Sequence, residues 1–156
     1  MRRYTHLPVP NAPLTDKERH GHWDVSMTFS HKTVPAYWHE DTVYLYGVDL
    51  FNAELFWEAH EVWEKKWHYS KAYHPDFADW IQGLIQVSAA CLKRSEQNQQ
   101  GFVHNIKKAQ QHLQTYIYLK TVMGIEVDSW LQILHAFAGN DIHSISVYPK
   151  IALTFP

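Results

Sequence analysis

The sequence predicts an all-α fold, a compact bundle of about four helices with an extended N-terminal arm and an irregular C-terminal tail. Two observations lead to this prediction. Apolar residues recur at steps of three or four along four segments joined by short connections, as in helices that bury one face. The chain also offers no candidate strands for a parallel sheet. Packed helices are the architecture that such segments form.

Residues 1–40 are the predicted arm, and residues 41–156 are the predicted single helical domain. The arm holds four of the seven prolines and shows no sustained periodicity, which favours an extended chain packed on the body. It also contains a run of alternating acids and histidines that fits either an accessory metal site or a polar loop. The loop is favoured because flexible backbone holds ligands poorly. The run consists of Asp16, Glu18, His20, His22 and Asp24.

The four helical segments follow from periodicity and from local start and stop signals. Residues 49–68 include neither glycine nor proline to interrupt a helix, and Pro75 suits the first turn of the next one. Asp128 can cap the last helix and Gly139 can end it. Residues 42–46 are strand-like in composition, but a lone strand would lack a partner, so a packed connector is expected. The helices are predicted near residues 48–68, 75–96, 102–123 and 128–138.

Composition excludes several classes of protein. The 14 basic and 16 acidic side chains give a net charge of -2 without a basic block, which argues against nucleic acid as a partner. The longest apolar run, residues 80–92, is shorter than the ~20 residues that a membrane span needs. No signal peptide is visible, and the single cysteine, Cys91, excludes an internal disulfide. A cytoplasmic protein without a membrane partner is therefore expected.

The segment 49–68 also carries the candidate chemistry. At ~100° per residue, His60 and Glu64 lie on one narrow stripe beside the packing side formed by Ala59 and Val62. An imidazole and a carboxylate four residues apart can bind one divalent cation, but two ligands are too few. A third must come from elsewhere in the chain or from a second subunit. The sequence does not rank the candidates, which are Glu61, His68, Asp79 and the histidines of the arm.

A second pattern lies within the same residues. The run His60-Glu61-Val62-Trp63-Glu64 has the form of the zinc-protease helix with its second histidine replaced by glutamate. In that motif the glutamate beside the first histidine activates a metal-bound water, which makes Glu61 a candidate general base for hydrolysis of a small substrate. Zinc, iron or manganese would suit this mixed ligation. Because the second histidine is absent, the sequence does not decide whether the protein is an enzyme.

The same residues also fit an interpretation without metal. A buried hydrogen bond between His60 and Glu64 would hold the bundle in register, and the many aromatic side chains could form an interface in a homo-oligomer. The protein would then be a non-catalytic interaction or oligomerisation module. Two glutamines on the most apolar helix would either support the stripe or bond to each other. The side chains expected around the stripe are Trp57, Trp67, Gln82 and Gln86.

Three stretches carry a family resemblance: Asp-Leu-Phe-Asn, Phe-Trp-Glu-Ala-His-Glu-Val-Trp-Glu and, later, Gln-Gly-Leu-Ile-Gln. Over about residues 47–137 the chain resembles the prokaryotic family catalogued as domain of unknown function 309. That family is described by a His-x-x-x-Glu-x-x-Trp or Tyr signature, suspected of metal binding, on a helical fold. The signature matches His60, Glu64 and Trp67. The resemblance implies a helical bundle and supports the metal hypothesis, and it implies no activity.

Overall fold

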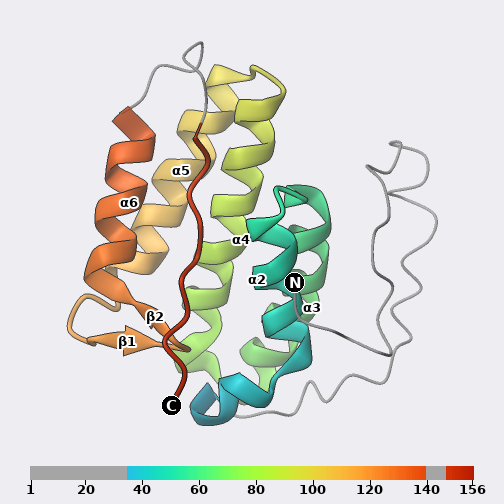
Figure 1. The fold of residues 1–156 in the computed structure, drawn as a ribbon, viewed down its shortest axis with the longest axis vertical. Coiled ribbons are helices and arrows are strands. Elements are labelled where there is room, and N and C mark those ends of the chain that lie inside the picture. Colours follow the sequence, from blue (N-terminus) through green and yellow to red (C-terminus); the bar gives the residue numbers. More distant parts are fainter. Residues whose placement is uncertain (1–34, 140–146) are drawn as a thin grey trace.

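The computed structural model describes residues 35–139 and 147–156. The described chain is mostly helical (Figure 1), which confirms the predicted all-α class. Its elements are a 3-10 helix η1 (Pro35–Glu40), the α-helices α2 (Thr42–Asn52), α3 (Phe56–Tyr73), α4 (Pro75–Ser95), α5 (Gln99–Gln114) and α6 (Val127–Gly139), and the short strands β1 (Thr121–Val122) and β2 (Ile125–Glu126). The two strands pair antiparallel, with Thr121 opposite Glu126.

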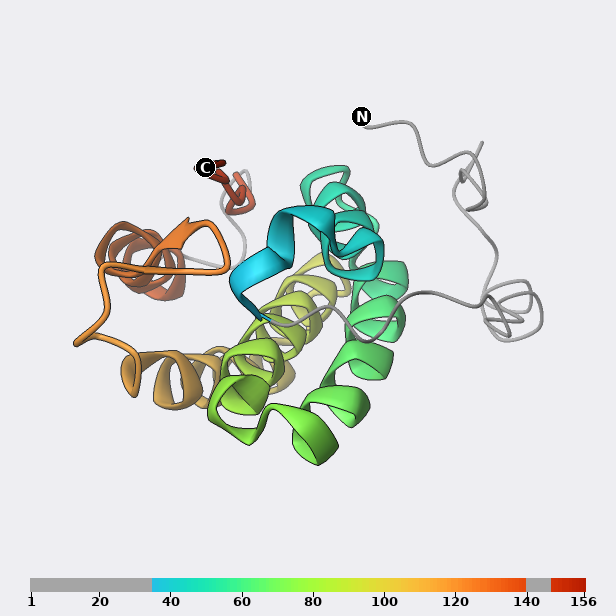
Figure 2. The same cartoon turned by 90° about the horizontal axis from the view of Figure 1, so that it is seen from below.

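Helices α2 to α6 surround a common core. Each helix packs mainly against its neighbours in the chain, α2 on α3, α3 on α4, α4 on α5 and α5 on α6. Seen from below (Figure 2), the C-terminal segment 147–156 lies between α6 and α2 and closes the ring. The largest buried side chains come from several of these helices and include Tyr44, Phe51, Trp63, Trp80 and Phe102.

Helices α2 and α3 pack closely at Gly47. A Cβ atom at this position would lie 2.1 Å from Nε1 of Trp63, so the indole ring occupies the space that a side chain would fill. The same Nε1 donates a hydrogen bond to the carbonyl oxygen of Tyr44 at 3.2 Å. Glycine is therefore required where the buried tryptophan of α3 crosses α2.

The prediction of one helix over residues 48–68 is wrong, because the chain breaks between α2 and α3. Glu54 has a positive φ of 63°. Its N–H donates to the carbonyl of Phe51 at 2.9 Å, and the N–H of Leu55 donates to the carbonyl of Leu50 at 2.9 Å. These two bonds form a Schellman motif, which ends a helix and usually contains glycine. The break folds α2 back against α3 and brings the rings of Phe51 and Phe56 to 5.4 Å.

The expected connector at residues 42–46 is also wrong, since these residues form the first turns of α2. The helix begins where the carboxylate of Asp41 accepts a hydrogen bond from the N–H of Tyr44 at 3.0 Å. A side-chain oxygen of this kind satisfies a donor that the helix itself leaves free. Just before it, residues 35–40 are a helical turn, where an extended arm was predicted. The rest of the arm, including the alternating acids and histidines, lies outside the described residues.

The later helices differ less from prediction. Helices α4 and α6 confirm the predicted segments to within one residue at each end. The prediction over 102–123 is too long, because α5 ends at Gln114 and the β1–β2 hairpin follows. Met123 and Gly124 form its turn, with φ values of 46° and 81°. Asp128 lies in the first turn of α6, and its carboxylate accepts a hydrogen bond from the Gln132 amide at 3.0 Å.

The C-terminal segment 147–156 is held by hydrogen bonds to distant parts of the chain. The side chain of Asn52 donates to the carbonyl of Ile151 at 2.8 Å and accepts from its N–H at 2.7 Å. The N–H of Thr154 donates to the carbonyl of Gly124 at 2.8 Å. The side chain of Ile151 is buried in the core. The segment thus ties the end of α2 to the β hairpin.

The helices in the described part of the chain are all too short or too polar to cross a membrane.

Candidate metal centre

Helix α3 presents two different sides. Ala59, Val62 and Trp63 are buried against the core, as the apolar positions of a packed helix should be. His60 and Glu64 lie beside them and are half-buried. The predicted polar stripe therefore borders the core and remains accessible from outside.

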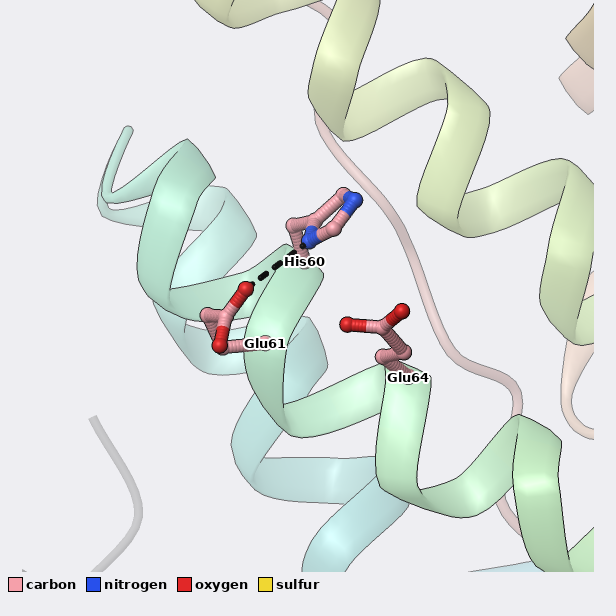
Figure 3. A group of neighbouring side chains, drawn as sticks. All are labelled: His60, Glu61 and Glu64. Carbon is pink, nitrogen blue, oxygen red and sulfur yellow. Dashed lines mark ion pairs between the residues drawn. The ribbon is translucent and has the colours of Figure 1, made fainter. Parts of the chain in front are cut away.

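The structure brings three potential ligands together on this border. His60, Glu61 and Glu64 each offer one ligand atom within 4.8 Å of the atoms offered by the other two. Nδ1 of His60 lies 3.4 Å from Oε1 of Glu61, with 26% and 35% of the two side chains exposed. Figure 3 shows that all three side chains project from the same side of α3, with the two carboxylates on either side of the imidazole. This is the one such group in the described residues.

Two further features concern the imidazole of His60. Its Nδ1 atom is buried and makes no hydrogen bond to any described residue. Its ring stacks on the indole of Trp57, with centroids 5.7 Å apart and planes 9° from parallel. Buried polar atoms normally have a partner. Apart from the 3.4 Å ion pair with Glu61, Nδ1 has no polar partner among the described residues.

The distances between the three ligand atoms are close to those around one divalent ion. Nitrogen and carboxylate oxygen bind zinc at about 2.0–2.2 Å, so two ligands of one ion lie at most about 4.4 Å apart. The three ligand atoms lie within 4.8 Å of one another, so they would have to move slightly closer together to share one ion. The donor set is one imidazole nitrogen and two carboxylate oxygens.

These side chains lie within the segment that matches a known family. Residues 44–105 match the family model described as "Domain of unknown function (DUF309)". The predicted resemblance is confirmed over this segment, which runs from α2 into α5. No curated protein and no solved structure matches the chain.

Of the candidates for a third ligand, the structure brings Glu61 into the group. His68 is exposed and lies outside it. Asp79, near the start of α4, is exposed, and its Oδ1 lies 3.6 Å from Nδ1 of His112. The histidines of the arm lie outside the described residues. All three potential ligands therefore come from two consecutive turns of α3.

The other side chains expected around the stripe have different surroundings. Trp67 is half-buried, and the ammonium group of Lys71 lies 3.6 Å from the centre of its ring. Gln82 and Gln86 lie on α4 and are half-buried. Oε1 of Gln86 is buried and has no hydrogen-bond partner among the described residues. A supporting role for these residues stays a prediction.

Two polar residues of α3 that were not among the predicted site residues are buried in the structure. Glu58 is 3% exposed and Lys66 is 1% exposed, although both lie on the same helix as the half-buried ligands. The Glu58 carboxylate adds to the effect of burial in raising the pKa of Tyr46 to about 12. Residue type alone does not predict the burial of Glu58 or Lys66, because α3 also contains glutamates and a lysine that are only half-buried.

Proposed function

We propose that this DUF309 protein binds a divalent transition-metal ion through His60, Glu61 and Glu64. The observation that carries the proposal is the convergence of three potential ligand atoms within 4.8 Å. The buried Nδ1 of His60 supports it, because no described residue donates to or accepts from that atom. An ion held there would give this buried nitrogen a partner.

The ligand set indicates which chemistry the ion could support. Three ligands from one side of one helix leave further coordination positions open, as in catalytic sites, whereas structural zinc sites are closed by four protein ligands. Water in an open position becomes a nucleophile when the ion lowers its pKa, which allows hydrolysis of a small substrate. In this arrangement Glu61 acts as the third ligand, in place of the general-base role that the zinc-protease pattern suggests.

Metal content tests the proposal. The protein is purified without a histidine tag, loaded with zinc or manganese, dialysed and measured by elemental analysis. We expect stoichiometric metal in the wild type and its loss in His60→Ala and Glu64→Gln, with a weaker retention in Glu61→Gln. The matched control is His68→Ala, which removes an exposed imidazole from the same helix and should retain the ion. Absence of metal from the loaded wild type would refute the proposal.

The alternative, a non-catalytic interaction or oligomerisation module, makes a different prediction. If His60 and Glu64 serve only to hold the bundle together, both variants should lose thermal stability in metal-free buffer, because each leaves a polar partner stranded. If they serve as ligands, the variants should melt near the wild type in chelator and differ from it only when metal is added. Melting curves with and without EDTA therefore separate the two functions.

A further inference from the structure

We infer that Trp57 is a positioning residue for His60, and that its indole ring fixes the plane in which the imidazole presents Nδ1 to the ion. The inference rests on the proposed metal-binding function and concerns a residue that is itself no ligand. The two rings lie 5.7 Å apart and 9° from parallel. Residues three apart on a helix are neighbours on its surface, so this contact is built into α3.

The need for such a residue follows from the surroundings of His60. A histidine that binds a metal usually donates its other ring N–H to a carboxylate or carbonyl, and this hydrogen bond fixes the orientation of the ring. Nδ1 of His60 lies 3.4 Å from Glu61 and faces the ligand group. Nδ1 makes no hydrogen bond to any described residue, and its contact with Glu61 is an ion pair at 3.4 Å. Packing against the ring is therefore needed to restrict its orientation.

Stacking can supply that orientation. Aromatic rings with centroids 4.5–7 Å apart attract each other in offset parallel geometry. Rotation of the imidazole about its Cβ–Cγ bond would turn the edge of the ring into the indole face, so the parallel arrangement restricts this rotation. A ring held in place before the ion arrives loses less conformational freedom on binding. Trp57 should thus strengthen metal binding without contacting the ion.

Metal affinity measured with Co²⁺ tests this role. We expect Trp57→Leu to raise the Kd for Co²⁺ by about 10-fold or more, the lower end of the effect of losing a residue that orients a metal ligand. Trp57→Phe keeps an aromatic face and should restore most of the affinity. The visible absorption of bound Co²⁺, which reports ligand geometry, should change in the leucine variant and return towards that of the wild type in the phenylalanine variant.

The control is Tyr73→Leu, which removes the partner of another stacked pair on α3, Tyr69 and Tyr73, with centroids 4.6 Å apart. It should bind Co²⁺ as the wild type does. Melting in chelator shows whether a variant is folded, and affinities are compared only below its melting temperature. A Trp57→Leu protein that is folded and binds Co²⁺ like the wild type overturns this inference alone. A wild type that binds no metal overturns the proposed function and this inference together.

Discussion

The ammonium group of Lys66 on α3 forms an ion pair with the carboxylate of Asp41, and the two side chains are only 2% and 1% exposed. Asp41 also caps α2 by accepting a hydrogen bond from the N–H of Tyr44 at 3.0 Å. One carboxylate therefore begins one helix and anchors the next. The ring of Tyr69, 5.5 Å from the Lys66 nitrogen, adds a further favourable contact with the cation.

Removal of one member of this pair should destabilise the fold strongly. Lys66→Met leaves the carboxylate of Asp41 buried without its counter-charge, and breaking a buried pair in this way costs about 3–5 kcal/mol. The free energy of unfolding in urea measures the loss. The double variant Asp41→Asn/Lys66→Met keeps a capping oxygen and removes both charges, so it should recover part of the stability. A single variant as stable as the wild type would show that the pair contributes little.

The contact between Gly47 and Trp63 makes a second prediction. Alanine at an exposed helix position normally gains about 1 kcal/mol over glycine. At position 47 the added Cβ would lie 2.1 Å from Nε1 of Trp63, so we expect Gly47→Ala to lose about 1–3 kcal/mol through overpacking. Gly139→Ala is the matched control, because nothing lies within 4 Å of its Cβ position. Equal unfolding free energies for the two variants would contradict the close approach of α2 and α3.

Because Tyr46 and Tyr116 are buried, we expect the folded protein to become less stable to unfolding at high pH. Burial, with a smaller contribution from Glu58, raises the pKa of Tyr46 to about 12. Burial also raises the pKa of Tyr116 to about 12, although its hydroxyl accepts a hydrogen bond from the N–H of Trp80 at 3.1 Å. An unfolded tyrosine releases its proton near pH 10. The contribution of each group is therefore complete below about pH 10 and is lost as the pH rises to about 12.

Urea unfolding between pH 9 and 12 checks this prediction. The stability of the wild type should fall across this range by up to about 3 kcal/mol for each tyrosine, since one pKa unit corresponds to about 1.4 kcal/mol. Tyr46→Phe and Tyr116→Phe should each reduce the slope. Tyr118→Phe is the control, because this side chain is 77% exposed and should leave the slope unchanged. The same slope in all four proteins would contradict the assignment.

The helices that were predicted well are those with local signals. Pro75 begins α4 and Gly139 ends α6, as proline and glycine commonly do. The break after α2 has no such signal, since Glu54 takes the left-handed conformation that usually belongs to glycine. A distant residue supports it: the ammonium group of Lys150 donates to the carbonyl of Asn52 at 2.8 Å and to the Glu54 carboxylate at 3.0 Å. Local patterns do not contain that contact.

Only the part of the candidate site that depends on helical geometry could be predicted from the sequence. A spacing of four residues was enough to place His60 and Glu64 on one stripe. Whether Glu61 joins His60 and Glu64 depends on the directions of its side chain and of the imidazole. These directions are set by packing and do not follow from helical periodicity. The burial of Lys66 could not be foreseen for a similar reason. Helical spacing places Lys66 on the same side of α3 as the buried Val62 and Trp63, but the partner that allows its charge to be buried, Asp41, lies before α2.

The hydrogen bonds between Asn52 and Ile151 also set the order in which the fold can be completed during synthesis. The two residues are 99 positions apart, so a ribosome must make the intervening helices before the partner of Asn52 exists. Helices α3 and α4, which pack as sequence neighbours, can associate long before then. Until Ile151 is made, the side chain of Asn52 lacks both of these hydrogen bonds. The C-terminal end of α2 is therefore secured only after α3 and α4 have been able to pack.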